Sequence, residues 1–184
     1  MSKHVLVPIA DGSEEIETAC IVDVLRRAGA TVTVASVGKL QVTGSRDMKF
    51  IADRLLPECV DDMYDLIVLP GGMPGAEHLR DSKELTELLK RQNQDKRLYA
   101  AICASPAVVL QYHGLLDKRK ATAYPGFTDL LENTEAIDSR VVVDGNCITS
   151  RAPGTAMEFS LTLVDILYGE QKAKEIAQSM LVEW

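Results

Sequence analysis

The sequence predicts an α/β fold in which helices cover both faces of a mostly parallel sheet. Segments typical of strands alternate with segments typical of helices along the chain. The strand-length segments are almost continuously apolar, as expected when both faces of a sheet are covered. The chain has 184 residues, which is long enough for one domain with a sizeable core. We therefore expect a single domain over residues 1–184.

The first half of the chain contains three segments typical of buried strands and two typical of helices. We expect strands over residues 4–9, 31–35 and 65–69, where apolar and β-branched residues dominate. The acidic turn at 11–15 starts a helix that runs to about Ala28 and stops at Gly29. Residues 40–52 are expected to form a hairpin or a short extended excursion, and residues 81–94 have the periodicity of a helix.

The second half repeats this alternation. A short buried strand over 99–102 precedes a helix that Pro106 opens, since proline fits the first helical turn. Strands over 141–143 and 147–149 flank a turn and predict a hairpin, and helices over 154–167 and 171–180 follow. Ligand chemistry in such sheets gathers at the carboxyl ends of the strands. The loop after residue 9, the glycines at 71 and 72, and residue 103 all lie at such ends.

The composition limits which kinds of binding partner and which cellular compartment we expect. A net charge of −7 argues against nucleic acid or an anionic membrane surface as the main partner. No apolar run approaches the ~20 residues of a membrane span, and the N-terminus lacks a signal-peptide pattern. The four cysteines form no C-x-x-C pair and have no histidine at ligand spacing, so we expect no metal site and a reduced, cytoplasmic protein.

Cys103 is the strongest candidate for a reactive side chain. It lies at the predicted strand-to-helix turn, with the small residues Ala101 and Ser105 two positions away on either side. A sharp turn of this kind needs small neighbours because the backbone passes close to itself. Helical N–H groups would favour a thiolate there, so we expect a pKa below the usual ~8.5. The alternative is that Cys103 is only a small, buried apolar side chain.

Glu17 is the second candidate because it lies on the predicted buried face of its helix. At about 100° per residue, Glu17 falls within an apolar stripe, between Val24 and Ile21. A carboxylate on a buried face is unfavourable unless it is paired or protonated. A protonated Glu17 could donate a hydrogen bond to a thiolate or act as a general acid and base. The alternative is a first-turn acid that complements the helix dipole, which fits Glu14 and Glu15 better.

The glycine-rich loop and the histidines are the remaining candidates for functional-site residues. Gly71 and Gly72 follow a buried strand and could let backbone N–H groups form an oxyanion hole, although a plain turn fits them equally well. None of the three histidines is placed to pair with Cys103. We expect His113 to cap the end of the helix that follows Cys103, so a Cys–His protease triad is not supported.

Four ordered motifs resemble the ThiJ/PfpI superfamily. They are VPIADGSEEIET at 7–18, VLPGG at 68–72, AAICA at 100–104 and TSRAPGT at 149–155. The resemblance spans essentially the whole chain. It implies a flavodoxin-like, three-layer α/β sandwich that forms a homodimer and acts without a cofactor.

The resemblance also implies roles for individual residues. Cys103 is the nucleophile and redox-sensitive thiol, with protonated Glu17 beside it, and the N–H groups of Gly72 and Ala104 stabilise an oxyanion or an oxidised sulfur. Arg46 and Arg27 line the site, with Arg27 supplied by the dimer partner.

Two positions depart from the pattern of the superfamily. Tyr124 stands where some members have a histidine, so the role of that imidazole does not carry over. Ala104 stands where the protease-like members have a histidine directly after the nucleophile, which weakens a peptidase interpretation.

Two classes of function follow from these residues and the resemblance. The first is a cofactor-independent enzyme of carbonyl stress defence, which acts on methylglyoxal, glyoxal or their early protein adducts as a glyoxalase or deglycase. The second is a redox sensor and chaperone without enzymatic activity, switched by oxidation of Cys103. A peptidase or amidotransferase-like hydrolase is a third class of function, but the sequence does not place the histidine that such an enzyme needs beside Cys103. Residue identity does not separate the first two, because both need a reactive thiol.

Overall fold

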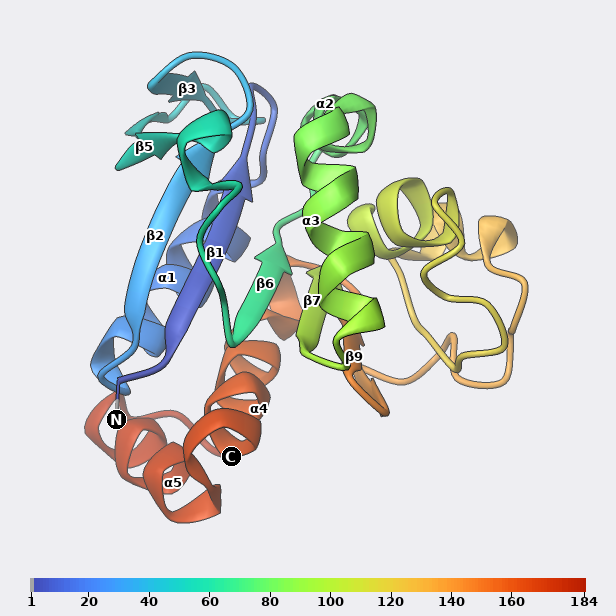
Figure 1. Ribbon diagram of the computed structural model, residues 1–184. Helices are drawn as coiled ribbons and strands as arrows, with labels where there is room; N and C mark the ends of the chain where they lie inside the picture. Colours follow the sequence, from blue (N-terminus) through green and yellow to red (C-terminus); the bar gives the residue numbers. More distant parts are fainter. Residues whose placement is uncertain (1) are drawn as a thin grey trace.

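The middle layer of the molecule is a seven-stranded sheet, seen in a computed structural model that describes residues 2–184 (Figure 1). The strand order is β5-β2-β1-β6-β7-β9-β8. The strands are β1 (His4–Ile9), β2 (Thr31–Ser36), β5 (Arg54–Leu55), β6 (Leu66–Leu69), β7 (Leu98–Ile102), β8 (Val141–Asp144) and β9 (Cys147–Ser150). Neighbouring strands pair in parallel, except that β8 runs antiparallel to β9. The predicted mostly parallel sheet is confirmed.

Helices cover both faces of this sheet, as the sequence predicts. The helices α1 (Glu15–Arg27), α4 (Ala156–Tyr168) and α5 (Glu170–Ser179) pack on one face, and α2 (Gly75–Asp81) and α3 (Lys83–Gln94) pack on the other. Strand β1 shows why its sequence is apolar throughout. Val5 and Val7 belong to the core under α1, whereas Leu6 belongs to the core under α3, because successive side chains point to opposite faces.

The predicted hairpin over residues 40–52 is confirmed as β3 (Gln41–Thr43) and β4 (Lys49–Ile51), which pair antiparallel outside the main sheet. Two backbone hydrogen bonds hold its turn against the loop between β1 and α1. Gly12 N–H donates to the Thr43 carbonyl at 2.8 Å, and Ser45 N–H donates to the Ser13 carbonyl at 2.9 Å. The hairpin is therefore fixed beside the first turn of α1.

Several elements differ from the prediction. The helix predicted over 81–94 is present as α3, which begins at Lys83 because Ser82 is extended and its hydroxyl caps the helix by accepting the N–H of Leu85 at 3.3 Å. The preceding helix α2 was not predicted. The short strand β5 and two 3-10 helices, η1 (Leu56–Cys59) and η3 (Pro125–Leu130), were not predicted. Strand β5 has only two residues and exists by pairing with β2, which no local pattern reveals.

The later elements agree with the prediction. Strands β8 and β9 form the expected hairpin, and α4 and α5 are the expected last two helices. The helix that Pro106 opens is present as η2 (Pro106–Gln111), a short π-helix. None of the helices in residues 2–184 combines the length and apolarity that crossing a bilayer requires.

Candidate active site

Cys103 lies at the carboxyl end of β7, on the predicted sharp turn into η2. Its φ is 64°, in the left-handed region, where a non-glycine residue costs about 1–3 kcal/mol. Two backbone hydrogen bonds hold it there: the Cys103 N–H donates to the Ser150 carbonyl at 3.0 Å, and the Tyr124 N–H donates to the Cys103 carbonyl at 2.8 Å. Segments distant in the sequence therefore hold the strained residue in place.

The loop after β6 packs directly against this turn. A Cβ atom on Gly71 would lie 2.6 Å from the Cβ of Cys103, which is closer than two such atoms approach. Gly72 has a φ of 87°, a conformation that glycine adopts without strain. The Ser105 hydroxyl donates to the Pro70 carbonyl at 2.5 Å. The two glycines are therefore required for the close approach of the β6 loop to the thiol.

Glu17 is fully buried on α1, as its helical face predicts. Its Oε2 accepts the N–H of Gly71 at 2.7 Å, and its Oε1 has no hydrogen-bond partner among residues 2–184. Burial raises the pKa of Glu17 to about 7, while the Gly71 N–H lowers it and the negative charge of Glu14 raises it. Glu17 therefore holds or releases a proton near neutral pH.

The Cys103 thiol and the Glu17 carboxyl titrate as a pair, since each shifts the pKa of the other. Burial and the charge of Glu17 raise the pKa of Cys103 to about 12, whereas the N–H groups of Gly72 and Ala104 lower it. The expectation of a pKa below ~8.5 is therefore wrong for a thiol beside an ionised Glu17. When the pair holds one proton, that proton therefore lies on the Cys103 sulfur beside an ionised Glu17, which is placed to take it when the sulfur reacts.

A cavity of about 290 Å³ opens above Cys103. Its lining residues are Cys103, Glu14, Ser45, Arg46, Gly72, Met73, Ala104, Tyr124, Phe127 and Pro153. The structure therefore brings Arg46, Tyr124, Gly72 and Ala104 to the thiol, where the resemblance places them. Gly71 does not line the cavity, but its N–H donates a hydrogen bond to Glu17. No local pattern indicates that Met73 and Phe127 belong to the site, because only the meeting of distant loops puts them at the cavity.

Glu15 has a role that its sequence position did not indicate. It is 4% exposed, and its carboxylate accepts the Ser45 hydroxyl at 2.9 Å and the Arg46 N–H at 2.5 Å. Although burial raises the pKa of Glu15, these hydrogen bonds hold it below its usual value. A Cβ on Gly44 would collide with the same carboxylate. Glu15 therefore anchors the hairpin turn that carries Arg46 to the cavity.

Two expected features are not found at this cavity. Arg27 lies at the far end of α1 and pairs with Asp23 at 2.5 Å, so it does not line the cavity of its own chain. Its supply by a partner stays a prediction. No histidine of the described chain lines the cavity. The expectation that His113 caps its helix is wrong, because its Nε2 lies 2.8 Å from the Arg80 carbonyl and 3.2 Å from the Thr86 hydroxyl.

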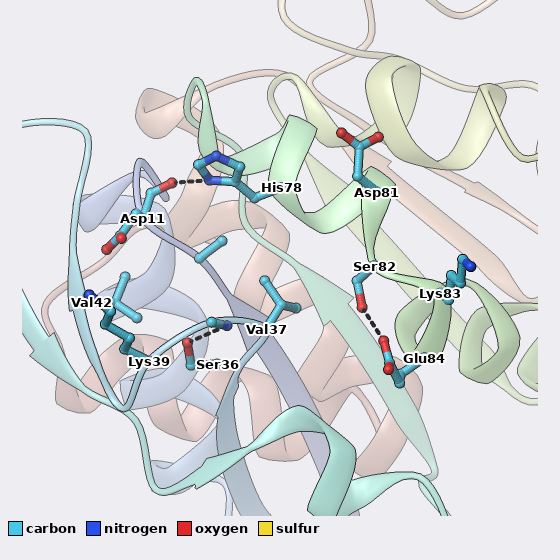
Figure 2. A pocket seen from close by; sticks show the side chains of 12 residues that line it. Asp11, Ser36, Val37, Lys39, Val42, His78, Asp81, Ser82, Lys83 and Glu84 are labelled. Carbon is cyan, nitrogen blue, oxygen red and sulfur yellow. Dashed lines mark hydrogen bonds between the residues drawn. The ribbon is translucent and has the colours of Figure 1, made fainter.

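A larger cavity of about 560 Å³ lies at the carboxyl ends of β1 and β2, beside the start of α3 (Figure 2). It shares no lining residue with the Cys103 cavity. Charged side chains of both signs line it, namely Asp11, Lys39, Asp81, Lys83 and Glu84. His78 donates Nδ1–H to the Asp11 carbonyl at 2.8 Å. The acids that line this larger cavity are exposed and no cysteine lines it, so the smaller cavity, which has Cys103 beside the buried Glu17, is the candidate active site.

Within residues 2–184, no three His, Cys, Asp or Glu side chains are grouped so that they could hold a metal ion.

The fold and the site define a three-layer α/β protein with a cysteine on a strained strand-to-helix turn beside a buried glutamate. Residues 3–166 match the profile of the DJ-1/PfpI family. The chain therefore belongs to the DJ-1/PfpI family, and the resemblance seen in its motifs is confirmed.

Individual relatives agree with this assignment. The structure titled "Toxoplasma gondii DJ-1, oxidized" is 48% identical with a TM-score of 0.97, and each chain covers 100% of the other. "Protein DJ-1 homolog B" of Arabidopsis thaliana is 51% identical over 180 residues, which are 97% of this chain and 41% of that protein. This chain thus spans less than half of that relative. "Glutathione-independent glyoxalase DJR-1.2" of Caenorhabditis elegans is 34% identical over 97% of this chain and 95% of that protein.

The raised pKa of Glu17 predicts how stability depends on pH. Between about 4.5, the usual pKa, and about 7, the folded chain binds a proton that the unfolded chain has lost. The contribution of Glu17 to the free energy of unfolding is therefore fully present below this range and is lost as the pH rises through it. The Glu17→Gln variant lacks this titration and serves as the reference. We expect the free energy of unfolding of the wild type to fall by about 3 kcal/mol relative to this variant as the pH rises from about 4.5 to about 7. Urea denaturation at constant ionic strength measures it, and a difference independent of pH contradicts the shift.

Proposed function

We propose that this protein is a cofactor-independent cysteine enzyme that acts on methylglyoxal, glyoxal or their early protein adducts. The observation that carries the proposal is the pair of Cys103 and Glu17 beneath the cavity of about 290 Å³. A nucleophile and a proton carrier with a pKa near neutrality meet there at one point. The relative named as a glutathione-independent glyoxalase supports this class of reaction.

The pair accounts for the conversion of methylglyoxal to lactate. As the Cys103 sulfur adds to the aldehyde carbon and forms a C–S bond, its proton passes to the ionised Glu17. The carbonyl oxygen becomes an oxyanion at the N–H groups of Gly72 and Ala104 and then takes that proton from Glu17. The ionised Glu17 then removes that carbon's hydrogen as a proton, which gives an enediolate, and returns it to the neighbouring carbonyl carbon. The hydroxyl proton of the first carbon passes to the oxygen of the second, so that the first becomes a carbonyl and the second an alcohol.

These steps balance without an external oxidant or reductant. The aldehyde carbon is oxidised to a lactoyl thioester while the neighbouring carbon is reduced to an alcohol. Water then hydrolyses the thioester, which releases lactate and restores the Cys103 thiol. In an early adduct on a protein side chain, the Cys103 sulfur would replace the side-chain nitrogen or sulfur at the same carbon. Its proton would pass through Glu17 to the departing group, so the same residues serve the deglycase form of the proposal. Peptidase or amidotransferase chemistry is not proposed, because no histidine of residues 2–184 lines the cavity.

Two substitutions test this mechanism. We expect wild-type protein to produce lactate from methylglyoxal slowly, without glutathione or added metal. Cys103→Ala should abolish the reaction, and Glu17→Gln should lower kcat/KM by at least ~100-fold, the usual contribution of a general acid and base. Cys20→Ala is the matched control, since it removes a thiol of α1 outside the cavity and should keep wild-type rates. Wild-type turnover by Cys103→Ala contradicts the proposal. Lactate formation is measured enzymatically.

The second candidate is a redox sensor and chaperone in which Cys103 becomes a sulfinate. The 48% identical relative whose structure is titled as oxidized favours it. Two molecules of peroxide would each transfer one oxygen to the sulfur and leave as water. The N–H groups of Gly72 and Ala104, together with protonated Glu17, are donors for the sulfinate oxygens.

Oxidation should be selective for Cys103 among the four cysteines. Cys103 lines the cavity, where the N–H groups of Gly72 and Ala104 are donors for an oxidised sulfur, whereas Cys20, Cys59 and Cys147 lie outside this cavity. Peptide mass spectrometry after graded peroxide should find sulfinate mainly at Cys103. Glu17→Asp, with its shorter reach, should change how far oxidation proceeds. Uniform oxidation of all four cysteines contradicts the prediction, and selective oxidation without any turnover favours the sensor over the enzyme.

We also propose that the protein is a homodimer through the outer face of α1 and the adjoining hairpin. Ile16 on α1 and Met48 and Ile51 on the hairpin are 55%, 57% and 80% exposed. Arg27 lies on the same helical face as Ile16, since eleven residues are close to three full turns of about 3.6 residues each. Burial of this apolar surface favours association.

Sedimentation at micromolar concentration should find a dimer. Ile51→Glu should shift the protein toward the monomer by placing a charge in the apolar interface, whereas Leu181→Glu, at a residue 95% exposed near the C-terminus, should not. A monomeric wild type excludes a contribution of the partner's Arg27 to the site.

A further inference from the structure

The cavity above Cys103 is lined by several large apolar side chains as well as by polar ones. Four of its residues are Met73, Tyr124, Phe127 and Pro153, which we call the apolar lining. They come from three segments: the loop after β6, the η3 segment, and the loop between β9 and α4. The Tyr124 side chain is 45% exposed and Met73 is 38% exposed, so much apolar surface faces water.

The backbone that carries the two aromatic rings is hydrogen bonded to the turn that carries the thiol. Tyr124 N–H donates to the carbonyl of Cys103 itself, and Phe127 N–H donates to the Tyr124 carbonyl, both at 2.8 Å. The two ring centroids are 6.4 Å apart with an interplanar angle of 56°, which is a tilted aromatic pair. The segment that carries both rings is therefore held by a backbone bond that also holds the strained nucleophile.

The chemistry at Cys103 decides which part of a substrate meets the apolar lining. The reacting carbonyl carbon must lie at the sulfur, with its oxygen at the N–H groups of Gly72 and Ala104. The remainder of the molecule then extends from this floor toward the other residues of the cavity. A methyl group covers little of the apolar lining, whereas a flat ring can pack against the Tyr124–Phe127 pair and against the Met73 thioether.

We propose that this cavity selects carbonyl compounds that carry a planar aromatic substituent, such as arylglyoxals, over methylglyoxal. The proposal rests on the proposed function for its substrate class. Release of water from Met73 and Tyr124 drives the selection, because both leave apolar surface exposed when no substituent covers them. Tyr124 and Met73 are thus specificity-determining residues, while Cys103 and Glu17 carry the reaction.

Turnover gives the first test. Wild-type kcat/KM should be at least ~10-fold higher for phenylglyoxal than for methylglyoxal, the size of effect that an apolar pocket gives. Met73→Ala and Tyr124→Ala should each reduce this ratio severalfold. Cys103→Ala supplies the background, including the reaction of phenylglyoxal with arginine side chains. Tyr112→Ala is the matched control, because this ring is 68% exposed and lies outside the cavity.

Alkylation gives a second test that does not depend on turnover. Phenacyl bromide and bromoacetone each form a C–S bond with Cys103 and release bromide, and they differ in carrying a phenyl or a methyl group. Rates at Cys103 are followed by peptide mass spectrometry and divided by the rates with free N-acetylcysteine. We expect the normalised rate for phenacyl bromide to be at least ~10-fold higher, with the preference reduced in Met73→Ala and Tyr124→Ala.

The two tests separate the failure of this inference from the failure of the proposed function. If neither aldehyde is turned over but the alkylation preference is present, the enzymatic proposal fails and the selection by the apolar lining stands. Equal normalised alkylation rates in the wild type overturn the selection. A preference that both variants retain in full also overturns it, since it then arises elsewhere.

Discussion

The hydrogen bond from the Gly71 N–H to the buried carboxyl of Glu17 is the contact on which the rest of the site depends. It joins the first turn of α1 to the loop after β6, directly beneath Cys103. The loop can approach this closely only because residue 71 has no side chain, since a Cβ would meet that of Cys103. With Gly71 in place, the N–H of Gly72 faces the sulfur. One backbone contact thus sets the positions of the acid, the donor and the nucleophile.

The site keeps two unfavourable features that its surroundings offset. Cys103 has a backbone conformation that non-glycine residues rarely adopt, and it is held by the Ser150 carbonyl and the Tyr124 N–H. Glu17 is a carboxyl group in the core, and burial raises its pKa to about 7. Both features are useful in chemistry. The strained turn places the sulfur at the floor of the cavity, and the raised pKa lets Glu17 exchange a proton near neutrality.

The order of strands explains why this chemistry occurs at one edge of the sheet. Strands β6, β7 and β9 are neighbours, so their carboxyl ends bring Gly72, Cys103 and the loop containing Pro153 together. The remaining lining is added by the β3–β4 hairpin, which Glu15 anchors through Ser45 and Arg46. The cavity is therefore assembled from segments spread over most of the chain.

The sequence by itself determined the alternation of strands and helices, the turn at Cys103 and the burial of Glu17. These follow from local periods of 2 and about 3.6 residues and from small residues beside a turn. Only the tertiary structure decided the raised thiol pKa, the burial of Glu15 and the apolar lining, including Phe127. A pKa depends on the charges and burial that surround a group, and a cavity depends on which distant loops meet. Neither is encoded by a local pattern, because both arise from contacts that the sheet topology creates.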